Sequence, residues 1–118
     1  MAAPNIVNVS TITAKTAVAA LTTTNASLLT NSASSNQVYK INSIVFANYT
    51  SSAVSGTCTL SRSSTSYYFV GAVSVPANST LIVLAKDTSI YLEEGDIIQG
   101  LAGANSSLTA IISYEIIQ

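Results

Sequence analysis

Few residues of this sequence have the chemistry that enzymes need. The chain has no histidine, the commonest general base and metal ligand, so neither a Ser-His-Asp nor a Cys-His site can form. Its one carboxylate cluster is Glu93, Glu94 and Asp96, around Gly95. Such a cluster could bind calcium or act as an acid/base pair. Because the nearby oxygen ligands are too few to complete a calcium shell, we favour a solvated turn between two strands. In that turn Gly95 would take a positive φ and Asp96 would bond to neighbouring backbone.

Aromatic residues are the next candidates for a binding site. Tyr67, Tyr68 and Phe69 are adjacent, and with Tyr49 they could contact a sugar or a base. On a strand, however, Tyr67 and Phe69 share one face while Tyr68 takes the other, which divides the platform. We therefore favour core packing for these three residues, with the hydroxyl groups reaching the rim.

Neither phosphate binding nor thiol chemistry is indicated. The glycines are scattered and form no phosphate-binding loop, and Gly100 and Gly103 are typical of turns. Cys58 is the only cysteine, so the chain can form no internal disulfide. Its neighbours Thr57, Thr59 and Leu60 predict a small buried hydrophobe on a strand. We predict a protein that is not an enzyme and has no cofactor or metal.

The composition indicates a protein that contacts other proteins. Charged residues are only 8% of the 118 residues, against a usual share of about 25%, while hydrophobic residues are 48%. This balance excludes a disordered chain. A surface so poor in charge is easier to explain if much of it faces protein, so we expect a homo-oligomer or a larger assembly.

Other classes of partner are not indicated. The four basic residues are spread along the chain and the net charge is −1, so we expect no direct contact with nucleic acid. The longest apolar run, residues 81–85, is far shorter than the ~20 residues that span a bilayer. The start of the chain lacks the basic region of a signal peptide. We therefore expect no membrane partner and no secretion.

Short runs with a period of two predict antiparallel strands. From Tyr39 to Tyr49 the odd positions form one face, but Ile44 and Phe46 lie on the other, which predicts a strand covered on both sides in its middle. The last run is the clearest. Its even positions from 108 to 116 form one face, and its odd positions from 109 to 117 form the other.

Clusters of turn-forming residues separate these runs. They lie at 22–25, 31–36, 50–56, 63–66, 76–80, 93–96 and 100–107. Such spacing predicts one domain over residues 1–118, all-β, with about seven to nine strands and little or no helix. We expect a single antiparallel β-sandwich or barrel, jelly-roll or immunoglobulin-like, and the alternation alone leaves that choice open.

Both ends of the chain carry candidate residues for an assembly interface. Ile116 and Ile117 place isoleucine on both faces of the last strand, which indicates either a central position in its sheet or a neighbouring chain against it. Residues 1–8 include Pro4, Ile6 and Val7 and carry no charged side chain. They form either an extended arm that adds a strand to a neighbour or a frayed terminus before the first strand.

Four segments together carry a resemblance to a known family. They are Pro4-Asn5-Ile6-Val7-Asn8-Val9, Val75-Pro76-Ala77-Asn78-Ser79-Thr80-Leu81, Ile90-Tyr91-Leu92-Glu93-Glu94-Gly95-Asp96 and Ile112-Ser113-Tyr114-Glu115-Ile116. In this arrangement the chain resembles small virion structural proteins of tailed bacteriophages, particularly those of marine and cyanobacterial hosts. The resemblance spans most of the chain and brings no catalytic residues with it. It implies a compact β-domain that decorates the capsid or forms part of the tail or a fibre.

The resemblance also implies a location and partners. The protein would be made in the bacterial cytoplasm and reside in the virion, on the capsid surface or the tail. Our first expectation is a capsid decoration or cement protein that contacts the major capsid protein and its own copies. We expect a trimer, because capsid lattices offer local three-fold sites. The alternative is a tail or fibre component that binds a receptor or glycan through Tyr49, Tyr67 or Tyr68.

Overall fold

The computed structural model describes residues 7–118, so the interface predicted at Pro4 and Ile6 lies outside the described part of the chain. Residues 7–118 form nine strands and one short 3₁₀ helix, which confirms the predicted all-β class. The elements are β1 (Ile12–Ala20), β2 (Ala26–Thr30), β3 (Val38–Asn48), β4 (Val54–Arg62), β5 (Thr65–Val75), β6 (Thr80–Leu84), η1 (Lys86–Thr88), β7 (Ile90–Leu92), β8 (Ile97–Ala102) and β9 (Leu108–Ile117).

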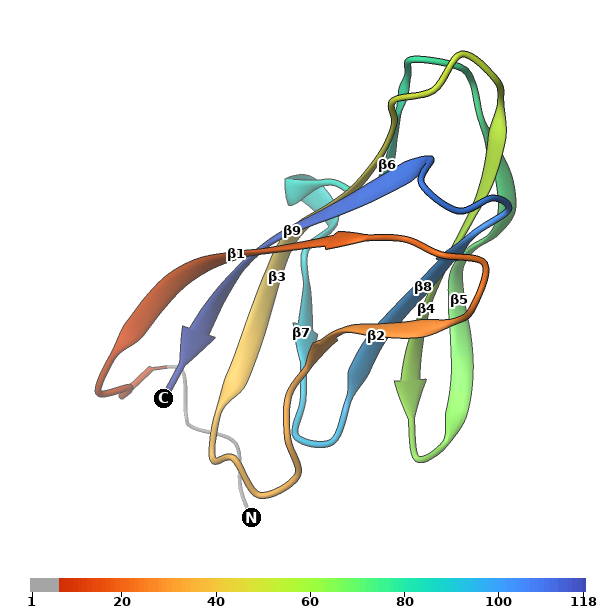
Figure 1. Ribbon diagram of the computed structural model, residues 1–118. Coiled ribbons are helices and arrows are strands. Elements are labelled where there is room, and N and C mark those ends of the chain that lie inside the picture. Colours follow the sequence, from red (N-terminus) through yellow and green to blue (C-terminus); the bar gives the residue numbers. More distant parts are fainter. Residues whose placement is uncertain (1–6) are drawn as a thin grey trace.

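The strands form two antiparallel sheets that pack as a sandwich (Figure 1). Sheet A has the order β1-β9-β3-β6, and β7 also pairs with β3; sheet B has the order β2-β8-β4-β5. The pairing is nested, because β1 pairs with β9, β2 with β8, β3 with β6 and β7, and β4 with β5. When β6 and β7 are taken as one interrupted strand, this is the strand order of a jelly roll.

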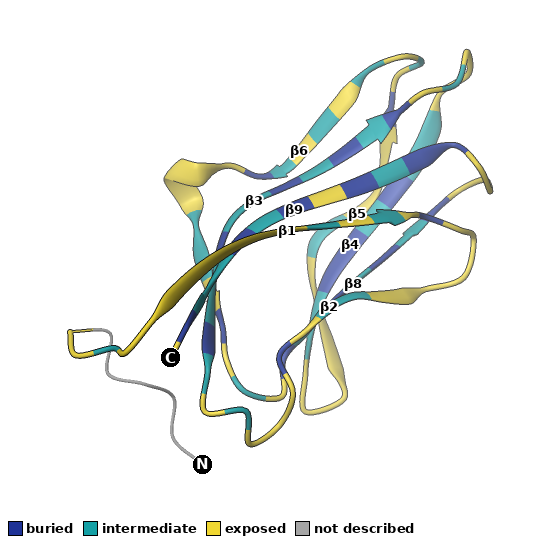
Figure 2. Ribbon diagram, turned by 60° about the vertical axis from the view of Figure 1, so that its left-hand side comes forward, coloured by how far each residue is buried: buried dark blue, intermediate teal, exposed yellow. Residues whose placement is uncertain are grey.

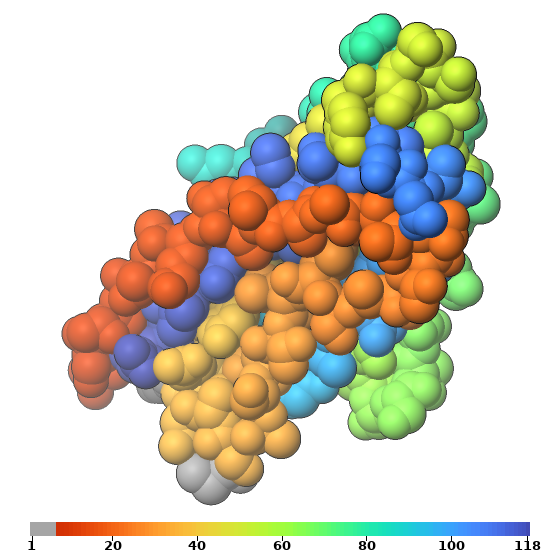
Figure 3. All heavy atoms as spheres, in the orientation of Figure 1, coloured from red at the N-terminus to blue at the C-terminus, as the bar shows by residue number. Residues whose placement is uncertain are grey.

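The chain passes from sheet A to sheet B directly after its first strand. Leu21 is buried at this crossing, and its N–H donates to the carbonyl of Leu108 at 2.9 Å. In Figure 3 the later part of β1 lies next to β2, while its first part extends away from β2 along β9. The first strand thus lies against both the last strand and the second.

The core lies between the sheets, and Phe46 is the largest of its fully buried side chains. Sheet B makes room for its ring with two glycines. A Cβ atom at Gly56 would lie 3.1 Å from Phe46 Cδ2, and one at Gly100 would lie 3.3 Å from Phe46 Cζ. Gly100 lies inside β8, so the prediction of a turn there is wrong, whereas Gly103 lies in the bend that follows β8. Close packing of two sheets explains the glycine within a strand.

β9 occupies a central position in sheet A, between β1 and β3. This confirms the first of the two explanations for isoleucine on both of its faces. Figure 2 shows the resulting alternation of more and less buried residues along β9. Since both of its neighbours belong to the same chain, β9 has no free edge for another one.

A β-bulge divides β3 into two parts. Ile41 pairs with Tyr114 and Ser43 with Ser113, so Asn42 is an extra residue on this strand. The bulge exchanges the two faces: Ile41 is buried before it, and Ile44 and Phe46 are buried after it. The prediction that the middle of this strand is covered on both sides is therefore wrong. Only one face of β3 is turned to the core, and the bulge shifts that face from odd-numbered to even-numbered residues.

Candidate functional site

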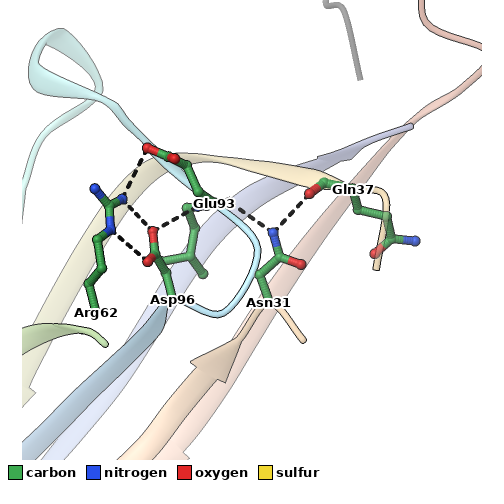
Figure 4. A network of polar contacts seen from close by, with 6 residues as sticks. Asn31, Gln37, Arg62, Glu93 and Asp96 are labelled. Atoms are coloured by element: carbon green, nitrogen blue, oxygen red, sulfur yellow. Dashed lines mark hydrogen bonds and ion pairs between the residues drawn. The ribbon is translucent and has the colours of Figure 1, made fainter. Parts of the chain in front are cut away.

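The acidic turn between β7 and β8 is clamped by an arginine (Figure 4). Arg62, the last residue of β4, donates from Nε to Asp96 Oδ1 at 2.8 Å and from Nη2 to Asp96 Oδ2 at 2.6 Å. Nη2 also donates to Glu93 Oε2 at 3.1 Å, and the Glu93 N–H donates to Asp96 Oδ2 at 2.8 Å. Gly95 has φ 88°, as predicted. Asp96 is buried, however, so the turn is not solvated at this residue.

This geometry makes the turn a structural element. Both carboxylate oxygens of Asp96 accept hydrogen bonds from the guanidinium group, and these bonds raise the pKa of Arg62. A buried carboxylate is stable only with such a partner, so the pair joins the end of β4 to the β7–β8 turn. In the described residues, no group of three or more His, Cys, Asp or Glu side chains could hold a metal ion.

Two buried asparagines, which the sequence analysis missed, hold loops in place. Asn31 donates from Nδ2 to the carbonyls of Gln37 (3.0 Å) and Leu92 (2.9 Å), and its Oδ1 accepts from Ser35 Oγ (2.6 Å). Figure 4 shows that Asn31 lies near the clamped turn. The amide thus joins the loop before β3 to the end of β7.

Asn48 does the same for other loops. Its Nδ2 donates to the carbonyls of Ser52 (2.9 Å), Val75 (3.0 Å) and Pro76 (3.3 Å). Its Oδ1 accepts from the N–H and the hydroxyl of Thr50 at 2.9 and 2.7 Å. Nothing in the sequence distinguishes Asn31 and Asn48 from the other asparagines. They become buried only when strands from distant parts of the chain pack around them.

Cys58 is confirmed as a small buried residue. Its side chain has no exposed surface, and burial raises the pKa of its thiol to about 12. A thiol that stays protonated is a poor nucleophile, so Cys58 contributes to packing and not to chemistry.

The structure does not bring the candidate tyrosines together. Tyr49 follows β3 in the connection at the top of Figure 1, while Tyr67 and Tyr68 lie near the β4–β5 turn at the bottom. All three are more than half exposed, at 56%, 57% and 69%. The core-packing interpretation holds for Phe69, which packs against the core, and is wrong for Tyr67 and Tyr68.

The candidate interface residues differ in how much surface they offer. Val7 is 90% exposed. Ile117 is buried, and Ile116 packs against the core, because β9 is enclosed in sheet A. Of these three, only Val7 therefore offers a large apolar surface to another molecule.

A continuous apolar row crosses the outer face of sheet A. Val18 of β1 pairs with Ile111 of β9, Ile111 pairs with Val45 of β3, and Val45 pairs with Ile82 of β6. The exposed fractions are 74% for Val18, 42% for Ile111 and 64% for Ile82, and Val45 is half-buried. Paired side chains lie about 5 Å apart, so the four form one strip. We name this row, Val18, Ile111, Val45 and Ile82, the outer apolar ladder.

A shallow hollow of about 390 Å³ lies beside the ladder, between β1 and β9. It is lined by Val18, Ala19, Ala20, Thr109, Ala110 and Ile111. Most of the side chains that line it are small, and no titratable group lines the hollow. It can therefore receive an apolar side chain but cannot supply acid, base or nucleophile.

The rest of this face is small and polar near the ladder and charged only further away. Ala20, Thr109, Ala47 and Thr80 form the adjoining row on one side, and Thr16, Ser113 and Ser43 lie on the other. Beyond these, Lys40 pairs with Glu115 across β3 and β9. The outer face thus has an uncharged centre with one opposite-charge pair towards one end.

The sequence indicates only part of this surface. Alternation in the last run places Ile111 on its more polar face, but does not place the other three ladder residues in the same row. Their alignment depends on strand pairing between distant segments, which alternation within one strand does not contain.

Comparison with known proteins identifies no relative, since no family model and no curated protein matches the chain. The resemblance to bacteriophage virion proteins therefore stays a prediction. In the part of the chain that the structure describes, no helix is long and apolar enough to cross a membrane.

Proposed function

We propose that this protein is a non-enzymatic structural protein of a tailed-bacteriophage particle, with capsid decoration as its role. The observation that carries the proposal is the outer apolar ladder, a row of exposed Val and Ile side chains on a face whose centre is uncharged. Contiguous apolar surface of this kind marks sites of protein contact. The ladder and its hollow have no group that could do chemistry.

Burial of the ladder would supply binding energy without any special site. Val18 and Ile82 have most of their side-chain surface still exposed, and covering each would contribute about 1–2 kcal/mol. The surrounding Ser and Thr hydroxyl groups can exchange hydrogen bonds across a wet rim. Such a contact serves a decoration protein whether it is made to a second copy of the chain or to a capsid subunit.

The fold is compatible with the proposed function but does not distinguish it from other functions. Jelly rolls occur in viral capsid domains and also in lectins, and a single fold carries many unrelated functions. The low charge and the sequence resemblance add support for the particle.

The copy number of the chain in purified particles tests this proposal. Quantitative mass spectrometry against the major capsid protein should give comparable numbers for a decoration protein. Only a few copies per particle would contradict capsid decoration and favour the tail, and absence from particles would contradict both locations. Deletion of residues 1–8 should release the protein from capsids if they form the predicted arm.

A tail or fibre component that binds a receptor or glycan is the second candidate. The observation in its favour is the exposure of Tyr67 and Tyr68 near the protruding β4–β5 turn. Exposed aromatic rings stack on sugars and bases. On a glycan array, Tyr68→Ala should abolish binding while Tyr49→Ala, at the opposite end, leaves it intact. Equal binding by both variants, or no binding by the unmodified protein, would contradict this candidate.

A further inference from the structure

The outer face of sheet A has an arrangement that matches itself under a two-fold rotation. Its strand order is β1-β9-β3-β6, so the centre of the sheet lies between β9 and β3. The ladder reads Val18, Ile111, Val45, Ile82 across these strands, with β-branched side chains at every position. Read from either end, the row is apolar and of similar size.

We propose that a second copy of this chain docks on this face, with sheet A packed against sheet A. A two-fold axis parallel to the strands, between β9 and β3, places β9 over β3 of the partner and β1 over β6 of the partner. Residues that pair across the sheet lie at the same position along the strand direction, and a rotation about an axis parallel to the strands leaves that position unchanged. Ile111 therefore meets the partner's Val45, and Val18 meets the partner's Ile82. The two ladders then cover each other along their whole length, as in the packing of aligned sheets.

The charges on the face fit the same operation. Lys40 and Glu115 are paired neighbours on β3 and β9, so the axis places Lys40 of each copy over Glu115 of the other. Asn42 donates to Glu115 Oε2 at 3.1 Å. Both ion pairs of the described residues involve Arg62, so within that part of the chain Lys40 and Glu115 form no ion pair, and the Glu115 carboxylate has the Asn42 amide as a neutral partner. Charge complementarity thus favours a second copy over an unrelated apolar partner.

The area of the face is sufficient for a dimer. Four strands about 4.8 Å apart, with rows from Ala14 to Ala20 at about 3.3 Å per residue, give a footprint of roughly 25 Å by 25 Å once side chains are included. Both copies together would bury on the order of 1,200 Å², the lower end of stable interfaces.

Edge-to-edge pairing is the less favourable way for two copies to meet, because each sheet edge is guarded. β1 carries Lys15 and β5 has register shifts and a positive φ at Ala72. β2 has only five residues, and η1 separates β6 from β7. Charges, bulges and short edge strands all oppose pairing with another chain.

This inference rests on the proposed function only in treating the ladder as a protein-contact surface. The inference is tested on the isolated chain. A chain that does not dimerise would therefore leave the proposed capsid role untouched, and absence of the chain from particles would leave the dimer untouched. Sedimentation equilibrium of the full chain, at concentrations up to about 100 µM, should give twice the mass of 12.1 kDa. Val18→Asp and Ile82→Asp should each weaken the dimer by more than about a hundredfold, because each would bury a carboxylate in the ladder.

Val73→Asp is the matched control, because Val73 is a partly exposed valine on β5 of sheet B. It should leave the dissociation constant unchanged. A chain that is monomeric over the whole concentration range would overturn the inference. So would a trimer, the state expected from the sequence, or an equal loss of association in Val73→Asp.

A charge exchange tests the two-fold geometry itself. Lys40→Glu places one carboxylate opposite the partner's Glu115 at each of the two contacts, and Glu115→Lys places one amine opposite the partner's Lys40. Each variant alone should therefore dimerise at least about tenfold more weakly. An equal mixture of the two should recover association, because every contact between the different chains is again of opposite charge. In each variant, residues 40 and 115 of the same chain carry like charges, and this repulsion within the chain persists in the mixture. Recovery of association can therefore only come from the contacts between chains. Failure of the mixture to associate would overturn this arrangement, even if the unmodified chain is a dimer.

Discussion

At the scale of single residues, buried polar side chains connect segments that the strands alone would leave loose. Asn48 uses both its amide nitrogen and its carbonyl oxygen, and Asp96 uses both carboxylate oxygens. Each of these groups is buried, so each would lose free energy if a partner were removed. The loops of this chain are therefore held by a few fully bonded groups.

Asn48→Ala should lower the free energy of unfolding by about 2–4 kcal/mol, because three carbonyls and one N–H each lose a hydrogen bond that is buried or partly buried. Urea denaturation measures the change. Asn25→Ala is the control, since its amide makes one exposed hydrogen bond to Gln99, and it should change stability by less than about 0.5 kcal/mol. Equal effects of the two substitutions would contradict the role given to Asn48.

Cys58 predicts a pH dependence of stability. Its pKa is raised from an ordinary value of 9.0 to about 12 in the folded protein, so above pH 9 the unfolded chain loses a proton that the folded chain keeps. The stabilisation is therefore complete below pH 9 and is lost as the pH rises towards 12, with a loss on the order of 1 kcal/mol at pH 10.

Urea denaturation at pH 7.5 and pH 10 measures this loss as a difference between the unmodified chain and Cys58→Ala. The variant has no thiol to titrate and should fall less in stability. The raised pKa of Tyr39 acts in the same direction in both proteins and cancels in the difference. Identical pH profiles would show that Cys58 titrates normally in the folded protein.

At the scale of elements, the connection between β4 and β5 is a tight turn occupied by unfavourable residues. Ser63 has φ 53° and Ser64 has φ 62°, both left-handed. Two positive φ angles in succession are those of a type I′ hairpin turn, which suits the twist of the strands and favours Asn-Gly. The geometry of this hairpin is therefore imposed by its strands and not by its turn residues.

Replacing the turn with the preferred residues should stabilise the protein. Ser63→Asn with Ser64→Gly should raise the free energy of unfolding by about 0.5–1.5 kcal/mol, because both residues then adopt positive φ with less strain. Thermal or urea unfolding reports the gain. The matched control is Ser51→Asn with Ser52→Gly, where neither φ is positive; it should give no gain. A gain at both sites would mean that the turn strain is not the cause.

At the scale of the whole molecule, the nested pairing makes the first and last strands depend on each other. β1 pairs with β9 along its entire length, and β9 also pairs with β3. Sheet A therefore lacks its link between β1 and β3 until the end of the chain is in place. We therefore expect the described residues to fold as one cooperative unit.

A chain that ends at Ser107 should consequently remain unfolded by circular dichroism, since sheet A lacks its central strand. A peptide of residues 108–118 should restore the fold when added. The same peptide with Ile111→Asp should still restore it, because Ile111 lies on the outer face, whereas Ile112→Asp should not, because Ile112 is buried. Equal action of the two altered peptides would contradict the assigned faces of β9.

The sequence by itself determined the class of the fold and several local features. Alternation and turn residues predict an all-β chain, because the pleat has a period of two and only certain residues tolerate turn geometry. The glycine turn before β8 follows from the residues at 93–96, and Cys58 is recognisable as buried from its neighbours alone. These are properties of short segments.

The tertiary structure decided the features that depend on distant segments. Alternation shows which side chains share a face, but not which face is covered. It could not reveal the extra residue at Asn42, or that Gly100 lies in a strand beneath Phe46. It also could not align Val18, Val45, Ile82 and Ile111 in one row, because that row exists only once four strands from across the chain have paired. The candidate site is thus a product of strand register, and register is a property of the folded sheet.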